Sequence, residues 1–477
     1  MFGIFVLNIY RAATQSITID EAFTWSSFAS QPMAGLFAPY NVNNHVLNSL
    51  LIRLSVTLFG LSEFALRLPS VLAGGLYLAS TWRIAALLFG RGPWALATAA
   101  LLSLDPLLLD HLSAARGYGE SLAFWLAAVC CLVRALDDSE EHHLFSAGIL
   151  CGLAMAASPT ALFPVVATAV AWIVINRSRI SPRESVFSFE TISNQFAVPA
   201  ILIPCLLMAI PLSRASAGMF YFGARSLTDT VQSLTDASFG WGLASLSPVL
   251  GRLIGAIHNT AWPAVVGVFG ITAALTIWKL KGSDSESTDE LRIDRNLGFF
   301  GLILISVVVV LYVAHWGAGL LYPLSRTGLY FIPILVLSTS TICYRYRTVR
   351  VVSYAASLTS ALCLLIFILQ LRISQYAEWP ADAGTKTIST YIGAHYSSTA
   401  PLTIRASWEL ESALNFYRLR DRLNWKEITR DPLDEPGDVW VVMPTDSSAI
   451  EKLHLHPVYR DKLSGVVVAD RAPAPGQ

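Results

Sequence analysis

The chain has 477 residues, of which 54% are hydrophobic and 14% charged, and its mean hydropathy is +0.53. A soluble domain carries about 25% charged residues. The composition therefore excludes an ordinary soluble protein and indicates that lipid is the main solvent. The formal net charge is zero, so charge gives no reason to expect a nucleic-acid partner.

The first apolar stretch, residues 1–13, has an apolar core of roughly ten residues, too short to cross a bilayer alone. It lacks the basic n-region and small-residue cleavage site of a signal peptide. We expect a first helix that is short, or whose upstream part is missing from the sequence.

An acidic pair, Asp20 and Glu21, follows this stretch at the start of a polar loop, residues 14–62. Two carboxylates at the mouth of a membrane protein are candidates for chemistry. The plain alternative is that Asp20 caps a helix from Glu21 to about Ser30. A second, amphipathic stretch over residues 45–59 is expected to lie in the membrane interface.

Apolar stretches of about 17 to 25 residues are long enough to cross a bilayer. With the first stretch they predict about eleven spans. The others lie at 64–88, 93–110, 118–136, 143–158, 160–176, 195–213, 257–278, 297–316, 321–343 and 350–371.

Basic residues in the connections predict the orientation. Three connections on one side of the predicted membrane carry Arg177, Arg179, Arg183, Lys279, Lys281, Arg292, Arg295, Arg345, Arg347 and Arg350. Because Lys and Arg are enriched in cytoplasmic loops, we expect a cytoplasmic N-terminus. Residues 14–62, 214–256 and everything after 371 then lie outside the cytoplasm.

The C-terminal part differs in composition from the rest. Strand-like segments at 401–406, 439–443 and 464–469 alternate with helix-like segments at 408–419 and 447–453. This alternation predicts a small α/β domain with a partly parallel sheet. We therefore expect an all-α polytopic membrane domain over residues 1–371 and an extracytoplasmic α/β domain over residues 372–477.

Three sequence stretches carry a resemblance to a known family. The first loop reads DEAFT at 20–24 and LLIRLSVTLFGLSEFALRLPS at 50–70, followed by LLSLDPLLLDHLSAARGYGESLA at 101–123 and PLSRTGLYFIP at 323–333. Together they resemble the GT-C glycosyltransferases, in particular the branch of protein O-mannosyltransferases and lipid A aminoarabinose transferases. Where that family has His-Pro-Pro in the first loop, this chain has Asn43-Asn44-His45-Val46, so only the histidine carries over.

The resemblance implies an enzyme that takes a sugar from a polyprenyl phosphate and passes it, with inversion, to an acceptor outside the cytoplasm. It implies that Asp20 is the base, with Glu21 as its partner or as an acceptor for sugar hydroxyls. Arginine binds phosphate oxygens bidentately, so Arg116 and Arg326, at the outer ends of their predicted spans, are candidates for the donor phosphate. The remaining candidates are His45 and Tyr118 beside the phosphate, and Asp105 and Asp110 as a second acidic group.

Each of these residues has a structural alternative. An arginine at a span end also reaches lipid headgroups, His45 could be a plain polar contact, and Arg67 is expected to hold the loop. No His, Cys and Asp spacing requires a metal, and we predict none, although a divalent cation between carboxylates and phosphate stays open. The six cysteines lie in apolar runs and are expected to be small buried hydrophobes.

Two other functions remain open at this point. A transporter or flippase of a glycolipid or other amphiphile would show charges near mid-membrane and two related halves, but no internal repeat is evident in the sequence. An inactive relative that scaffolds an envelope complex is the other, and the acidic pair argues against it. The expected partners of the enzyme are the lipid-linked donor, a protein, lipid or glycan acceptor, and the bilayer of a bacterial inner membrane.

Overall fold

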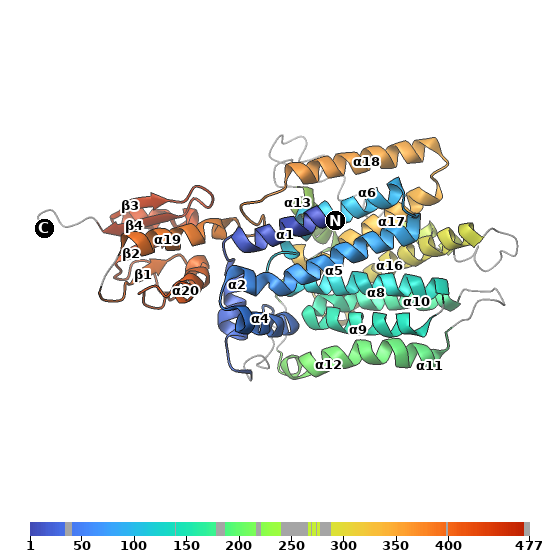
Figure 1. Cartoon of the computed structure of the whole chain (residues 1–477), viewed down its shortest axis with the longest axis horizontal. Helices are drawn as coiled ribbons and strands as arrows, with labels where there is room; N and C mark the ends of the chain where they lie inside the picture. The colour runs from blue at the N-terminus through green and yellow to red at the C-terminus, as the bar shows by residue number, and fades with distance from the viewer. Residues whose placement is uncertain are drawn as a thin grey trace, which may run out of the picture.

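The computed structural model describes residues 1–33, 41–138, 140–177, 187–215, 221–239, 266–268, 270–272, 274–276, 288–396 and 399–471. A bundle of long helices occupies one end of the molecule and a small α/β unit the other (Figure 1). Arg179, Arg183, Lys279, Lys281, most of the expected span at 257–278 and most of the expected outer loop at 214–256 lie outside these residues.

The bundle is built from helices of very different lengths. Its α-helices are α1 (Phe2–Thr14), α2 (Ile19–Thr24), α4 (Val46–Phe59), α5 (Glu63–Phe89), α6 (Pro93–Leu104), α7 (Pro106–His111), α8 (Gly117–Asp138), α9 (Glu141–Ala157), α10 (Leu162–Arg177), α11 (Phe189–Thr191), α12 (Val198–Ser213), α13 (Leu227–Phe239), α16 (Thr288–Ala318), α17 (Phe331–Arg345) and α18 (Arg350–Leu369). Short π-helical or 3₁₀ turns are η1 (Trp25–Ala29), η2 (Pro159–Ala161), η3 (Ile192–Ala197) and η5 (Ser325–Gly328).

Six helices in the described part of the chain are long and apolar enough to cross a membrane. They are Glu63–Phe89, Gly117–Asp138, Pro159–Arg177, Phe189–Ser213, Asp289–Ala318 and Arg350–Leu369. The chain is therefore an integral membrane protein, as its composition predicts. The expected count of about eleven spans is not confirmed, because several of the expected spans are shorter helices.

Two of these differences have a local cause. The expected span at 93–110 is divided, because Asp105 ends α6 and its side chain accepts a hydrogen bond from the backbone N–H of Leu108, which caps α7. Pro106 at the first position of α7 favours this helix start. The expected span at 321–343 begins its helix only at Phe331, because η5 precedes α17.

The core of the bundle lies between α5, α8, α10 and α16, and α18 lies at its edge (Figure 1). Trp125 on α8 is fully buried there, and its indole N–H donates to Thr168 Oγ1 on α10 at 3.1 Å. In contrast, only 6% of the apolar window of α18 is buried. The outer face of α18 is therefore suited to contact with lipid.

The α/β unit contains the expected strands and one more. Its four strands are β1 (Ile404–Ala406), β2 (Val439–Val442), β3 (Leu455–Arg460) and β4 (Val467–Arg471), in the order β1-β2-β4-β3. The pair β1–β2 is parallel and the other two pairs are antiparallel, so the predicted partly parallel sheet is confirmed. The edge strand β3 escapes prediction because it contains Pro457 and is largely exposed.

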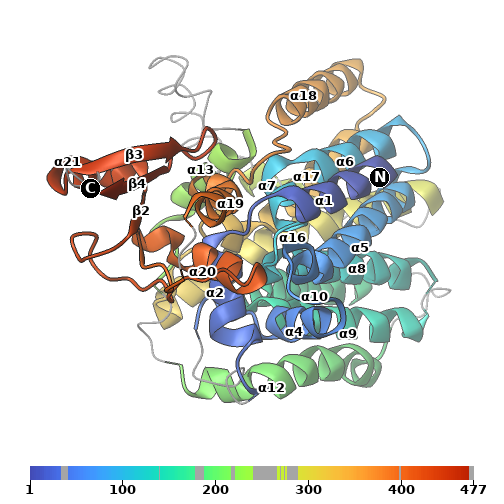
Figure 2. The same cartoon turned by 60° about the vertical axis from the view of Figure 1, so that its left-hand side comes forward.

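The helices of this unit are α19 (Thr385–His395), α20 (Glu411–Arg420) and α21 (Ser448–Lys452), with 3₁₀ turns η6 (Pro380–Gly384), η7 (Trp408–Leu410) and η8 (Pro444–Asp446). Helix α20 lies against α2 of the bundle (Figure 2). Glu63, at the start of α5, accepts hydrogen bonds from Arg420 on α20 and pairs with Lys386 on α19. The end of the bundle that carries α2 is therefore covered by the α/β unit.

Candidate active site

The acidic pair lies on α2, and its helix begins earlier than expected. The Thr18 side chain accepts from the backbone N–H of Glu21 at 3.2 Å, and the Glu21 carboxylate accepts from the backbone N–H of Thr18 at 2.9 Å. This reciprocal capping box starts the helix at Ile19. The expectation that Asp20 caps the helix is therefore wrong, and the Asp20 side chain is free for other contacts.

Asp20 meets two arginines and a tryptophan. Its Oδ2 atom lies 3.4 Å from Arg326 Nη1 and 3.9 Å from Arg116 Nη2, and it accepts a hydrogen bond from the Trp379 indole at 3.2 Å. These partners come from three distant segments of the chain. The structure therefore brings together three of the residues expected from the sequence, Asp20, Arg116 and Arg326.

The charges around Asp20 control its ionisation. Burial alone would raise the pKa of Asp20, but the positive charges of Arg116 and Arg326 and the hydrogen bond from Trp379 outweigh it and hold the pKa below its ordinary value. Asp20 is therefore a carboxylate at neutral pH, able to accept a proton or a hydrogen bond.

Arg116 is held rigidly behind Asp20. Its side chain is fully buried, and it donates to Thr24 Oγ1 and to Asn43 Oδ1, both at 3.1 Å, and to the backbone carbonyl of Asp20 at 3.4 Å. A guanidinium fixed by neutral acceptors keeps its charge directed at Asp20. Arg116 therefore differs from an arginine at a span end that extends to lipid headgroups, because its guanidinium is buried against protein groups.

Two glycines after Arg116 allow α8 to begin this close to its neighbours. A Cβ atom on Gly117 would lie 2.2 Å from the carbonyl oxygen of Ala157 and 2.8 Å from the His45 Cβ. A Cβ on Gly119 would lie 2.0 Å from the carbonyl oxygen of His111. Glycine at 119 therefore allows the close approach of α8 to α7, and glycine at 117 allows its approach to the end of α9 and to His45.

Arg326, on η5, joins Asp20 to a second carboxylate. Its Nη1 atom lies 3.2 Å from Glu378 Oε1, and its guanidinium lies over the Phe222 ring at 4.9 Å from the ring centroid. The side chains of Asp20, Arg326 and Glu378 are 15%, 18% and 18% exposed. Asp20, Arg116, Arg326 and Glu378 form one charged cluster. Its solvent-accessible part is Asp20, Arg326 and Glu378, and Arg116 lies behind them.

Glu378 and its partner His111 were not predicted as site residues. Glu378 Oε2 lies 2.7 Å from His111 Nε2, and the His111 side chain is only 1% exposed. The neighbouring Trp379 packs edge-on against the His111 ring. The signal available in the sequence was weak: an acidic residue beside a tryptophan shortly after the last apolar stretch, and a histidine inside the DHLSAARGYGE motif.

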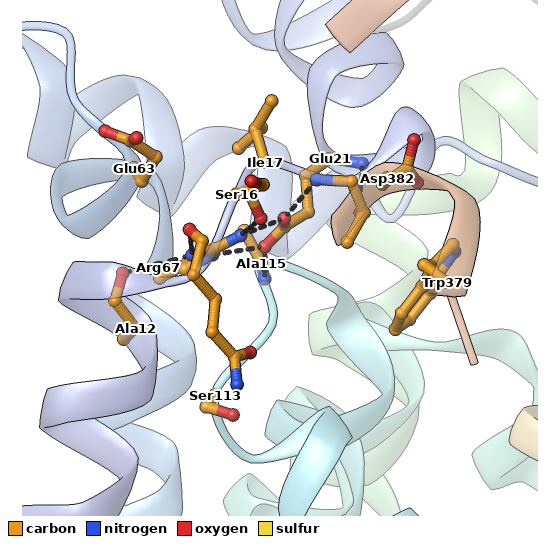
Figure 3. Close-up of polar contacts among 12 residues, drawn as sticks. Ala12, Ser16, Ile17, Glu21, Glu63, Arg67, Ser113, Ala115, Trp379 and Asp382 are labelled. Carbon is orange, nitrogen blue, oxygen red and sulfur yellow. Dashed lines mark hydrogen bonds and ion pairs between the residues drawn. The ribbon is translucent and has the colours of Figure 1, made fainter. Parts of the chain in front are cut away.

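Glu21 faces away from this cluster, into a closed network (Figure 3). The Arg67 guanidinium donates to both Glu21 oxygens, from Nε at 2.8 Å and from Nη2 at 2.7 Å, and the backbone N–H of Ala115 donates to Glu21 Oε1 at 2.6 Å. Arg67 also donates to the carbonyls of Ala12, Gln15 and Ser16. Both side chains are completely buried, so Glu21 has no access to a substrate. Arg67 holds the loop, as expected from the sequence.

His45 and Tyr118 lie beside the cluster, with their rings in edge-on contact at 4.5 Å between centroids. His45 Nδ1 lies 2.9 Å from the carbonyl of Ala157, which can only accept, so Nδ1 carries the proton. Burial and the nearby Arg116 lower the pKa of His45 to about 3. The neutral ring therefore presents a lone pair at Nε2, and the expected donation from His45 to a phosphate does not fit this geometry. Tyr118 lines a small pocket together with Arg326.

The two candidate aspartates near α7 have other roles in the structure. Asp110 is paired with Arg11 and accepts from the backbone N–H of Ala377 at 2.7 Å, with both side chains of the pair buried. Asp110 thus joins α1 and α7 to the segment after α18. Asp105 caps α7 and lines a cavity of about 600 Å³ between α6, α13, α17 and α18. In the part of the chain that the structure describes, the hydrogen bonds and ion pairs of Asp105 and Asp110 involve residues other than Asp20 and Arg326, so these aspartates do not supply the second acidic group there.

Among the described residues, no group of three or more His, Cys, Asp or Glu side chains is arranged to hold a metal ion. The polar side chains around Asp20 and Glu378 instead contact one another in pairs. Arg116 and Arg326 face Asp20, and Arg326 and His111 face Glu378. An anionic ligand that enters this space meets the Arg326 guanidinium, with the charge of the buried Arg116 behind Asp20, and a hydroxyl group meets two carboxylates.

Comparison with known proteins adds a family for part of the chain. Residues 46–198, which are 153 of the 477, match the model of the dolichyl-phosphate-mannose-protein mannosyltransferase family. The stretch contains α4 to α10 and Arg116. It confirms, over these residues, the resemblance to protein O-mannosyltransferases predicted from the sequence. The sequence matches no curated protein at a significant level.

Solved structures of two other proteins are among those similar to the whole chain. ArnT from Cupriavidus metallidurans in the apo state has 14% identity, with 98% of this chain and 97% of that chain covered and a TM-score of 0.49. The same protein bound to undecaprenyl phosphate has 13% identity, 99% and 97% coverage and a TM-score of 0.42. The archaeal oligosaccharyltransferase AglB from Archaeoglobus fulgidus, in complex with an inhibitory peptide and a dolichol-phosphate, has 12% identity, 99% and 75% coverage and a TM-score of 0.45.

Proposed function

We propose that this protein is a membrane glycosyltransferase that moves a sugar from a polyprenyl-phosphate donor to an acceptor outside the cytoplasm. The observation that carries the proposal is the Asp20 carboxylate, partly open, with Arg326 at 3.4 Å and Arg116 at 3.9 Å. A base beside two phosphate-binding groups is what the transfer requires. The family match and the resemblance of the DEAFT and ARGY motifs support the same reaction.

In the proposed reaction, an acceptor hydroxyl oxygen forms a bond to C1 of the donor sugar. The bond from C1 to the phosphate oxygen breaks, and its electron pair leaves with the lipid phosphate. Asp20 takes the proton of the hydroxyl as general base. This single displacement inverts the anomeric centre, unlike the double displacement of retaining hydrolases, in which a carboxylate is the nucleophile.

Arg116 and Arg326 then have two successive roles. Before the donor binds, their charges stabilise the Asp20 carboxylate and hold its pKa low. A bound phosphate attracts the same charges, so Asp20 becomes a stronger base when the donor is present. As the phosphate leaves, the two guanidinium groups stabilise the charge that develops on it.

The position of the cluster favours catalysis over transport. It lies at the end of the bundle beside the α/β unit, where α2 and the segment after α18 meet (Figures 1 and 2). The described arginines of the basic connections lie at the end of α10, near the start of α16, and between the end of α17 and the start of α18. These helix ends point away from that unit (Figure 1), and the arginines are Arg177, Arg292, Arg295, Arg345, Arg347 and Arg350. By the positive-inside rule, we propose that the site and the α/β domain, residues 372–477, lie on the extracytoplasmic side of a bacterial inner membrane.

The test is release of radiolabelled sugar from a panel of polyprenyl-phosphate sugars by the purified protein in lipid, with Asp20→Asn beside it. Loss of a general base lowers the rate by about 10²- to 10⁴-fold. Asp434→Asn, an exposed aspartate of the α/β unit, is the matched control and should turn over normally. A folded Asp20→Asn protein with native turnover would overturn the role of Asp20.

Other outcomes separate the alternatives. If the native protein binds a polyprenyl phosphate but releases no sugar, the panel lacks the acceptor, and protein, lipid and glycan acceptors are then supplied in turn. If it neither binds nor releases any donor, the enzyme proposal fails and transport of a glycolipid or other amphiphile becomes the better explanation.

A further inference from the structure

Glu378 is the second carboxylate of the cluster, and it comes from outside the bundle. It lies in the segment between the end of α18 at Leu369 and the start of η6 at Pro380. Its two oxygens are used separately: Oε1 lies 3.2 Å from Arg326 and Oε2 lies 2.7 Å from His111. The segment that leads into the α/β unit therefore forms one wall of the candidate active site.

Two neighbours, the buried His111 and the half-buried Arg326, fix the direction of this carboxylate. His111 is almost fully buried behind it, and Arg326 lies between it and Asp20. Burial alone would raise the pKa of Glu378, but the adjacent His111 and Arg326 outweigh burial and hold it below its ordinary value. With 18% of its side chain exposed, Glu378 offers free lone pairs of an anionic carboxylate to the same space as Asp20.

The chemistry of the donor decides which part of it Glu378 can meet. A carboxylate repels a phosphate, so Glu378 does not face the phosphate oxygens without a proton or cation between them. A sugar presents hydroxyl groups, and an ionised carboxylate accepts hydrogen bonds from hydroxyls strongly. The two arginines then lie toward the phosphate, and Glu378 lies toward the sugar.

We propose that Glu378 is a substrate-binding residue that accepts hydrogen bonds from hydroxyl groups of the donor sugar, and that His111 is its positioning residue. This inference rests on the proposed function. It assigns part of sugar recognition to the segment after α18, so the α/β unit is attached to the bundle through residues that bind the substrate. Trp379, which follows Glu378 and donates to Asp20, ties the same segment to the base.

The test compares two ligands of equal charge. One is the polyprenyl-phosphate sugar most active in the donor panel, and the other is a polyprenyl methyl phosphate, a diester without sugar hydroxyls. The ratio of their dissociation constants isolates the contribution of the sugar and cancels changes in phosphate or lipid binding. Glu378→Gln should reduce the preference for the sugar-bearing ligand by about ten- to a hundred-fold, because a charged hydrogen bond is lost.

The control is Glu63→Gln, which removes another partly buried, ion-paired carboxylate far from the ligand, at the contact with Arg420 and Lys386. Its preference ratio should equal that of the native protein. Glu378→Asp keeps the charge on a side chain that is shorter by one methylene. Its preference ratio should lie between those of the native protein and Glu378→Gln. If Glu378→Gln and Glu378→Asp both keep the native ratio, Glu378 acts only in folding or in overall electrostatics and the proposal is overturned.

His111 is tested by the same ratio. His111→Phe removes the contact with Glu378 and should lower the preference for the sugar-bearing ligand, whereas His111→Gln, whose amide can still donate, should retain more of it. A folded His111→Phe protein with the native ratio would overturn the positioning role. If the native protein binds neither ligand, the proposed function itself fails, which is a different result from a ratio that does not change.

Discussion

Asp20 and Glu21 are consecutive carboxylates on one short helix, yet they belong to two different regions. The Glu21 region is closed: both oxygens are used by Arg67 and Ala115, and the side chain has no exposure. The Asp20 region is open, with long contacts to Arg116 and Arg326 and a side chain that is 15% exposed. Successive residues of an α-helix point about 100° apart, which is enough to direct one carboxylate into the bundle and the other toward Arg116, Arg326 and Trp379.

The two regions differ in their roles: the Glu21 region supports the helix, and the Asp20 region can contact a ligand. Glu21 and Arg67 fix the helix that carries Asp20, while Asp20 keeps contacts loose enough to exchange for a ligand. Short, saturated ion pairs resist rearrangement, whereas arginine contacts of 3.4 and 3.9 Å leave donor capacity unused. In the proposed reaction, the catalytic member of this acidic pair is the one with incomplete hydrogen bonding.

The largest expected effect comes from breaking the closed region. Arg67→Met leaves the Glu21 carboxylate buried without its cation, which should cost about 3–5 kcal/mol of unfolding free energy. Thermal unfolding in detergent measures it. Arg53→Met serves as the control and should unfold near the native temperature, because the Arg53 guanidinium donates to the exposed Gln31 carbonyl and not to a buried carboxylate. Native thermal stability in Arg67→Met would mean that the region is not the closed support described above.

A change in the open region should have a smaller effect on the free energy of unfolding, but it should lower activity. Arg326→Met removes one of the two cations that face the leaving phosphate, and kcat should fall by about 10²- to 10³-fold. Thermal stability should change less than in Arg67→Met, because Arg326 is 18% exposed and water can reach Asp20. Sugar release and thermal unfolding on the same preparation compare the two regions directly. An Arg326→Met protein that unfolds as early as Arg67→Met and is otherwise active would reverse the comparison.

The sequence predicts a site residue only when the pattern around it is local. It does not predict contacts between partners that are far apart in the sequence. The DEAFT and ARGY motifs predicted Asp20 and Arg116 because both lie in recognisable local patterns. The role of Glu21 was not predictable, because its partners Arg67 and Ala115 lie 46 and 94 positions away. The pairing of Glu378 with His111 joins positions 267 apart, and the local patterns around the two residues are too weak to predict it.

The fold shows the same limit. Apolar runs predicted the long helices, and strand–helix alternation predicted β1, β2 and β4. The Asp-Pro pair at 105–106 indicated a helix end at Asp105. A single span was predicted there nevertheless, because the apolar run is long. Hydrophobicity alone does not reveal where a polar side chain will cap a new helix inside such a run.

The pH dependence of activity refines the description of the open region. Since the pKa of Asp20 is lowered, its charged form persists as the pH falls below the ordinary value of 3.8, and the acid limb of kcat/KM should lie below that pH. Trp379→Phe removes one hydrogen bond to the charged form, so the limb should move upward by about one pH unit or less. Profiles of the native protein and Trp379→Phe test this shift, and a shift to lower pH would contradict the assignment.

The smallest effect should come from the contact between the bundle and the α/β unit. Glu63 Oε1 pairs with Lys386 at 3.0 Å and with Arg420 at 2.5 Å, but the Lys386 side chain is 36% exposed. An exposed ion pair is worth about 0–1 kcal/mol, so Lys386→Met should lower thermal stability only slightly.

Arg420→Met is the matched comparison for Lys386→Met, because the Arg420 side chain is only 16% exposed and also stacks over Tyr417. Tyr417 in turn accepts the backbone N–H of Ile17 at 2.8 Å, just ahead of α2. We expect Arg420→Met to be the more destabilising of the two and less sensitive to salt. If Lys386→Met proved the more damaging, the exposed cation would be holding the two units together, and the support for α2 would extend beyond the closed Glu21 region.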